Sequence, residues 1–98
     1  MEPSDILASL LDLAREAGLE VRPVGRQGLD AGEPAPGSAV CRVRGAVWVM
    51  LSSEDPVAIQ LEVLADALRR HAAALLETRH LPPAVRAVLE VGRASPRG

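Results

Sequence analysis

The sequence contains no lysine, asparagine, tyrosine or phenylalanine, and Trp48 is its only aromatic residue. All eleven basic residues are therefore arginines, and thirteen acidic residues bring the net charge to −2. Binding of nucleic acid usually requires a basic surface, and single strands are held by bases stacked on aromatic rings. We therefore expect no nucleic-acid partner, and we attribute the arginines to a GC-rich coding genome.

Cysteine occurs only at Cys41, so the chain cannot form an internal disulfide, and no Cys/His cluster suggests a metal or another cofactor. We interpret Cys41 as an inert, buried thiol. Apolar runs of about 18 residues, as a membrane-spanning helix needs, are absent. The N-terminus also lacks the basic region and apolar run of a secretory signal. We expect a cytoplasmic protein without a cofactor and without a membrane partner.

The 98 residues, 48% hydrophobic and 24% charged, are typical of one globular domain. We place a single α+β domain at residues 1–91. Residues 25–38 hold four glycines and two prolines, which predicts a flexible loop. Residues 92–98 are interpreted as a disordered tail.

The first helix is predicted over residues 4–17, where apolar side chains recur at helical spacing. Ser4 or Asp5 is expected to cap its beginning, and Gly18 is expected to end it. The alternation of apolar and charged residues over 19–24 then predicts a strand.

Residues 39–51 predict a β-hairpin with a type I′ turn at Arg44–Gly45. Pairing across a two-residue turn divides the side chains between two faces. One face holds Cys41, Val43, Trp48 and Met50. The other face holds Arg42, Arg44, Val40, Val47, Val49 and Leu51. Both faces of the second hairpin strand are therefore apolar, and both need cover.

Residues 56–78 predict one long amphipathic helix, capped by Ser53 or Asp55 ahead of Pro56. A short helix is expected over residues 83–91. The resulting order, α-β-β-β-α-α, predicts an α+β fold. In it, the long amphipathic helix and the N-terminal helix pack on a small three-stranded antiparallel sheet. The expected apolar stripe of the long helix consists of Val57, Leu61, Leu64, Leu68, Ala72 and Leu75.

This order of elements resembles the catalytic core of the ImmA/IrrE-type metallopeptidases over roughly residues 5–75. In that family a Gly-Ile/Leu-x-Val strand follows the first helix, as GLEVRPV does here. A hairpin then leads through a Ser/Pro cap into a helix that bears HExxH, and SSEDPVAIQLEVLADALRRH matches that segment. The resemblance implies a peptidase-like scaffold in which residues 64–70, LADALRR, stand where the zinc-binding motif would be.

The residues of LADALRR differ from HExxH at each working position. The motif holds one Zn²⁺ between two histidines a helical turn apart, and its glutamate activates a water molecule. In the matched alignment, Asp66 and Arg70 stand at the histidine positions and Ala67 stands at the glutamate position. Arg70 cannot ligate a metal, and the methyl group of Ala67 cannot accept a proton. We therefore predict a degenerate scaffold that is not an enzyme.

The two histidines offer an alternative. On a continuous helix His71 and His80 lie about 180° apart, so they cannot share a metal ion. His71 lies about 20° from Leu64 on the helical wheel, which predicts a partly buried packing residue. The alternative function is a hydrolase with an unrecognised site near Asp66, Arg70 and His71.

The preferred hypothesis is a small non-catalytic protein that binds another protein or itself. If the helices cover the face with Trp48 and Met50, an apolar strip stays exposed on the opposite face. Such strips often mark partner surfaces, and a twofold dimer would bury the same strip on both copies. If the short C-terminal helix covers the strip instead, the strip belongs to the core. The predicted interface residues are Val40, Val47, Val49 and Leu51.

Overall fold

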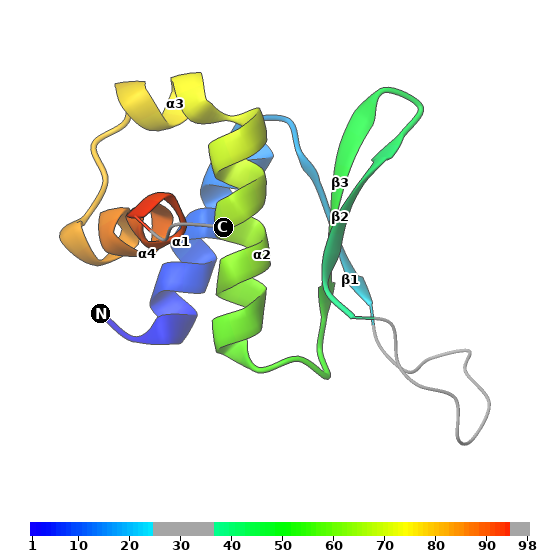
Figure 1. Ribbon diagram of the computed structural model, residues 1–98, viewed down its shortest axis with the longest axis horizontal. Helices are drawn as coiled ribbons and strands as arrows, with labels where there is room; N and C mark the ends of the chain where they lie inside the picture. Colours follow the sequence, from blue (N-terminus) through cyan, green and yellow to red (C-terminus); the bar gives the residue numbers. More distant parts are fainter. Residues whose placement is uncertain (25–36, 95–98) are drawn as a thin grey trace.

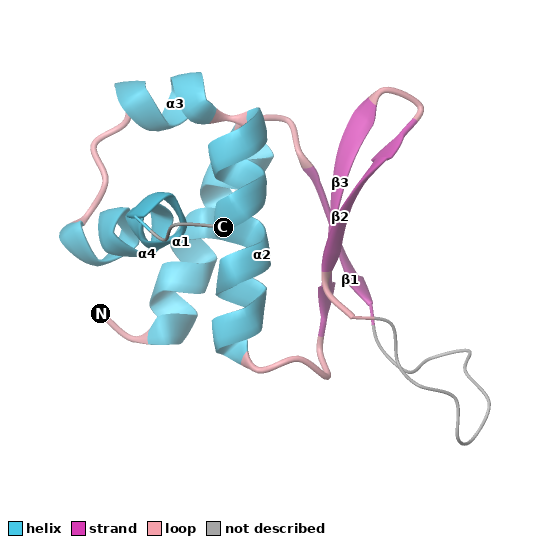
Figure 2. Cartoon of the chain, in the orientation of Figure 1, coloured by secondary structure: helices cyan, strands magenta, loops and turns pink. Residues whose placement is uncertain are grey.

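The computed structural model describes residues 1–24 and 37–94, except for the side chains of 91–94. The fold is α+β, as predicted, and the described residues form four helices and one three-stranded sheet (Figure 1, Figure 2). The helices gather on one side of the sheet. None of the helices in the described residues is long and apolar enough to cross a membrane. In chain order the elements are α1 (Pro3–Glu16), β1 (Glu20–Val24), β2 (Ala39–Val43), β3 (Ala46–Ser52), α2 (Val57–His71), α3 (Ala73–Thr78) and α4 (Pro83–Ala94).

α1 begins and ends one residue earlier than predicted. The expected caps, Ser4 and Asp5, lie inside its first turn, because Pro3 needs no hydrogen-bond acceptor for its nitrogen and suits the first helical position. At the other end Gly18 has a φ of 86°. The N–H of Leu19 donates to a carbonyl of the last turn at 2.9 Å, as in a Schellman motif.

The sheet is mixed, so the prediction of a purely antiparallel sheet is wrong. β3 lies in the centre, antiparallel to β2 and parallel to β1. The prediction specified no order of the strands, and in the structure β1 and β2 are the two edges of the sheet. Parallel neighbours need a connection of about a dozen residues or more, and residues 25–45 between β1 and β3 satisfy this requirement. β3 takes the central place because both of its faces are apolar.

The hairpin of β2 and β3 forms in the predicted register. Arg44 has a φ of 52° and Gly45 a φ of 84°, and a type I′ turn requires positive φ at both central residues. Cys41 pairs with Trp48, and Val40 pairs with Val49. The two predicted faces of the hairpin are therefore confirmed.

The predicted interface required the helices to cover the face with Trp48 and Met50, but they cover the opposite face of the sheet. Val49 is 0% exposed and Leu51 is 8% exposed. Val40 and Val47 are half-buried against the same core, beneath α2. The prediction that these four residues form an exposed interface is therefore wrong.

β1 explains which face of the sheet is buried. In the sheet Val21 pairs with Val49 and extends the apolar face. On the other face Glu20 pairs with Trp48 and Arg22 pairs with Met50. Burying these two charged side chains under the helices would cost more than leaving Trp48 half-exposed. The hairpin sequence alone did not contain this information.

α2 is the central helix, and it contacts α1, α3, α4, β2 and β3. Leu64 and Leu68 are fully buried in it. The predicted continuous helix over 56–78 is interrupted at Ala72, whose φ of −139° and ψ of 27° are not helical. Neither glycine nor proline marks this break, so tertiary packing must impose it. The change of direction keeps α3 over the end of α2 (Figure 1), where Leu75 and Leu76 pack on the core.

α4 packs on α1 and α2. Val85 and Leu89 are buried and form the inward side of this helix. The helix continues to Ala94, so the first three residues of the tail predicted at 92–98 are helical. The remainder of that tail lies outside the described residues.

Most of the loop predicted at 25–38 also lies outside the described residues, which resume at Gly37. Its last residue, Ser38, does not behave as part of a flexible loop. Ser38 is half-buried and is held by hydrogen bonds to two other segments.

Candidate functional site

The positions that match HExxH lie on α2, and the residues there make structural contacts. The Asp66 carboxylate accepts hydrogen bonds from Arg70 Nε at 3.1 Å and from Arg69 Nη2 at 3.4 Å. Ala67 is fully buried against the core. Among the described residues no group of three His, Cys, Asp or Glu side chains could hold a metal ion.

His71 is exposed, so the prediction of a partly buried packing residue is wrong. α2 ends at His71, and the buried position that follows belongs to Ala72. Asp66 and His71 are five residues apart in α2, which places them about 140° apart around the helix axis. The structure therefore brings Asp66 and Arg70 together and leaves His71 outside their contact.

A hydrogen-bond network joins the beginning of β2 to the segment between β3 and α2. The Ser38 N–H donates to Asp55 Oδ2 at 2.9 Å, and the Ser52 N–H donates to Ser38 Oγ at 2.8 Å. The backbone and side-chain hydrogen bonds from Ser38 lower the pKa of Asp55 below its ordinary value of 3.8, against a smaller opposing effect of burial. No histidine takes part, so we interpret the network as a structural clamp.

The same network corrects the predicted cap of α2. Neither Ser53 nor Asp55 caps the helix, and Pro56 occupies the N-cap position without a side-chain hydrogen bond to the helix. The Asp55 carboxylate instead accepts a hydrogen bond from the Ser38 N–H. The competing acceptor role of Asp55 could not be foreseen, because Ser38 is 17 residues away in the sequence.

The outer face of the sheet carries Trp48 and Met50, and none of the described helices covers it (Figure 1). At its centre the Arg22 guanidinium lies 5.0 Å from the centroid of the Trp48 ring. Arg22 Nε also donates to Glu20 Oε2 at 3.0 Å. Cys41 is the neighbour of Trp48 across the hairpin. The prediction of a buried thiol is wrong in degree, because Cys41 is only half-buried. Trp and Arg are the residue types that most often dominate protein interfaces, so this face is a candidate interaction surface.

The two edges of the sheet differ. β1 contains Pro23, which has no N–H to donate, and carries the charges of Glu20 and Arg22. β2 contains no proline and only one charged residue, Arg42. An unprotected edge strand offers its backbone groups to another chain, and prolines and charges normally prevent this. β2 is therefore the more accessible edge, a feature that the sequence could reveal only once the strand order was known.

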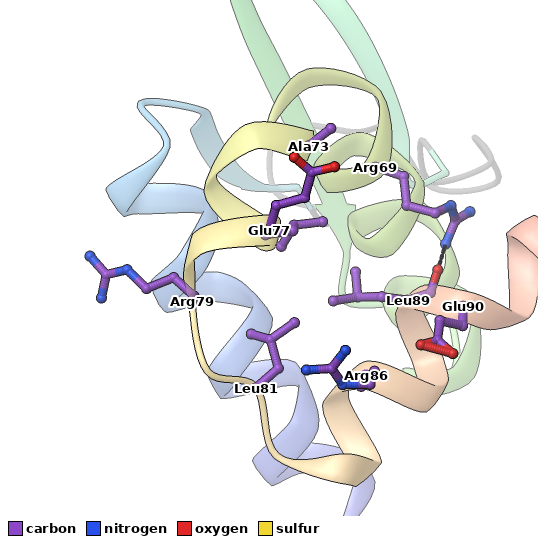
Figure 3. Close-up of a pocket in the computed structure, with 9 residues that line it drawn as sticks. Arg69, Ala73, Glu77, Arg79, Leu81, Arg86, Leu89 and Glu90 are labelled. Carbon is purple, nitrogen blue, oxygen red and sulfur yellow. Dashed lines mark hydrogen bonds between the residues drawn. The ribbon is translucent and has the colours of Figure 1, made fainter.

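A cavity of about 310 Å³ lies between the end of α2, α3 and α4 (Figure 3). Its lining combines three arginines and two glutamates with an apolar floor. The sequence did not indicate it, because the break at Ala72 turns α3 away from the axis of α2 and leaves a space between α3 and α4. The described residues that line it are Arg69, Ala73, Leu76, Glu77, Arg79, Leu81, Arg86, Leu89 and Glu90.

The candidate surfaces are thus the outer edge and face of the sheet on one side, and the cavity among the helices on the other. The first is formed by backbone groups and a half-exposed tryptophan. The second is formed by charged side chains around leucines. No family model, curated protein or solved structure matches the chain.

Proposed function

We propose that this chain is a non-catalytic interaction module that forms a homodimer by pairing the outer edge of β2 with β2 of a second copy. The observation that carries the proposal is the contrast between the two edges. Pro23 and two charges protect β1, whereas β2 presents five residues without a proline. Extension of a sheet by an added strand is a common mode of recognition.

The register of the hairpin implies which backbone groups point outward. In a two-residue hairpin the residues that flank the turn, Val43 and Ala46, form a hydrogen-bonded pair. Because such pairs alternate along an antiparallel ladder, Cys41 and Trp48 form the next one. Val40 and Arg42 therefore direct their N–H and C=O groups away from β3 and toward a second copy.

A twofold axis at Cys41 makes these groups complementary. Antiparallel pairing would then place Val40 of each copy opposite Arg42 of the other copy, in hydrogen-bonded pairs. The two Arg42 side chains would not face each other directly, so the like charges do not oppose the pairing. Cys41 would lie opposite Cys41 in a non-hydrogen-bonded pair, with Cα atoms about 4.5 Å apart.

The expected dimer is weak. Five residues of a strand extend about 17 Å, which gives a contact well below the roughly 1,200 Å² of a standard interface. The pairing would join two outer faces, each with its Trp48, into one six-stranded sheet. We expect a dissociation constant on the order of 0.1 mM.

Sedimentation equilibrium at increasing protein concentration tests the proposal. Arg42→Pro removes an outward N–H without removing a hydrogen bond to β3, and proline is tolerated on the free side of an edge strand. Arg42→Ala is the matched control, because it removes the side chain and keeps the N–H. We expect the parent chain and Arg42→Ala to dimerise, and Arg42→Pro to stay monomeric with an unchanged circular dichroism spectrum. A strict monomer at high micromolar concentration would contradict the proposal.

Oxidation of the single cysteine provides a second readout. The expected Cα separation of about 4.5 Å lies within the range that a disulfide spans. Mild oxidation should therefore convert the parent dimer into a covalent dimer, and Arg42→Pro should react much more slowly. Equal rates of crosslinking for the two proteins would place Cys41 away from the twofold axis.

A degenerate metallopeptidase-like scaffold is part of the same proposal. Its support is that Asp66 and Arg70 neutralise each other on α2 and that Ala67 is packed in the core. The alternative of a hydrolase at Asp66, Arg70 and His71 receives no support from the arrangement of these side chains. Zinc analysis of the purified protein tests both ideas, and a stoichiometric metal content would favour the hydrolase.

A further inference from the structure

The cavity between α2, α3 and α4 has the size of a site for a small molecule. Its volume is about 310 Å³, at the lower end of the range of roughly 300–1,000 Å³ that is usual for ligand pockets. One water-sized group occupies about 30 Å³, so the cavity corresponds to roughly ten non-hydrogen atoms.

The floor of the cavity is apolar. Leu81 and Leu89 are 8% and 4% exposed, so their side chains close the bottom of the space. Leu76, which is half-buried, contributes the side formed by α3. An alkyl chain would be removed from water by contact with these leucines, which favours binding by about 25 cal/mol for each Å² of apolar surface buried.

Two of the three arginines around the cavity are already engaged. Arg69 Nη1 donates to the carbonyl oxygen of Leu89 at 3.0 Å, and Arg69 also contacts Asp66. Arg79 forms an ion pair with Glu16 of α1. In Figure 3 the Arg79 side chain points away from the cavity.

Arg86 is the arginine that remains for a ligand. It forms no ion pair with another described residue, and its guanidinium points into the space beside Leu81 and Leu89 (Figure 3). A guanidinium presents two parallel N–H donors that match a carboxylate. The cavity thus offers a cationic head position above an apolar floor.

The two glutamates restrict the charge of the ligand. Glu77 and Glu90 also line the cavity, and neither forms an ion pair among the described residues. In Figure 3 the Glu77 carboxylate points away from the Arg86 guanidinium, whereas the Glu90 carboxylate lies on the side of Arg86, one turn further along α4. Their negative charge would oppose a phosphate, which carries more than one charge, more strongly than a carboxylate.

We propose that this cavity binds a medium-chain aliphatic carboxylate of about eight carbons, with the carboxylate on Arg86 and the chain on Leu76, Leu81 and Leu89. Octanoate has ten non-hydrogen atoms, which is the size that the volume allows. The site lies on the helical side of the molecule, away from the outer face of the sheet, so it does not depend on dimerisation through β2.

Titration with sodium octanoate, followed by backbone amide chemical shifts, tests the site. We expect saturable shifts in α3 and α4 for the parent chain. Arg86→Gln should weaken binding roughly tenfold or more, because a charge-assisted hydrogen bond is lost. Arg15→Gln is the matched control, since Arg15 is an arginine of α1 that is 69% exposed and does not line the cavity. It should bind octanoate like the parent chain.

A variant of the lining and two further ligands complete the test. Ala73 lies at the rim and is exposed, so Ala73→Leu should fill part of the space without unfolding the protein and should weaken binding. Octylamine and octyl phosphate should bind more weakly than octanoate. The proposal is overturned if octanoate causes no saturable shifts, if Arg86→Gln binds it as well as the parent does, or if octylamine binds equally well.

Discussion

The guanidinium of Arg22 lies over the ring of Trp48, 5.0 Å from its centroid, and Glu20 holds it in that position at 3.0 Å. Glu20 and Arg22 come from β1 and Trp48 comes from the neighbouring strand β3. The guanidinium shields the tryptophan ring on the face that none of the described helices covers. A cation held over a ring in this way adds about 0.5–1 kcal/mol at an exposed position.

Arg22→Gln should therefore lower the free energy of unfolding by about 0.5–1 kcal/mol. Loss of the guanidinium would also expose the Trp48 ring to more water, so its fluorescence maximum should move to longer wavelength. Urea unfolding followed by fluorescence measures both effects. Arg15→Gln removes an exposed arginine from α1 and should change neither; an unchanged emission spectrum for Arg22→Gln would show that the contact does not persist in solution.

Acid should weaken the clamp between Ser38 and Asp55. The pKa of Asp55 in the folded protein is lowered by hydrogen bonds from Ser38, so its carboxylate stabilises the fold above its ordinary pKa of 3.8. That contribution is lost as the pH falls below 3.8 toward the folded-state pKa. Asp55→Asn should therefore lose less stability than the parent chain between about pH 6 and about pH 2.5.

Urea unfolding at the two pH values measures this difference. Asp12→Asn serves as the control, because Asp12 is 80% exposed and forms an ion pair with Arg15 across one helical turn. It should lose as much stability on acidification as the parent chain. If Asp55→Asn also matches the parent chain, the clamp contributes nothing to acid sensitivity.

Leu64→Ala should be among the substitutions that lower the free energy of unfolding most. Its side chain is 0% exposed in the central helix α2, and removal of three carbons from such a site costs about 2–5 kcal/mol. Ile59, on the same helix, is 40% exposed, so Ile59→Ala should cost less than about 1 kcal/mol. Chemical denaturation measures the free energy of unfolding of the two variants. Similar losses of stability would show that Leu64 does not face the core more than Ile59 does.

Local features of the fold could be predicted from the sequence. Gly18 ends α1, and Arg44–Gly45 forms the predicted turn, because each depends on backbone conformations that neighbouring residues determine. The division of the hairpin into two faces was equally predictable, since side chains alternate along a strand.

Features that depend on distant contacts were not predictable in this way. The burial of Val49 follows from the charges that β1 adds to the opposite face, and those charges lie more than twenty residues earlier in the chain. The break at Ala72 has no sequence signal, yet it creates the cavity where Arg86 lies. Both candidate sites therefore depend on tertiary packing that no single segment encodes.

The parallel pairing of β1 with β3 has a consequence for the order of folding. The hairpin of β2 and β3 needs only a two-residue turn, whereas β1 must wait until residues 25–45 bring β3 alongside it. Closing the longer loop costs more chain entropy. Pairing of β1 with β3 offsets that entropy only when β3 is already in place. We expect the hairpin and α2 to form the folding nucleus, and α1 with β1 to join late. Mutations in the first 24 residues should accordingly speed unfolding more than they slow folding.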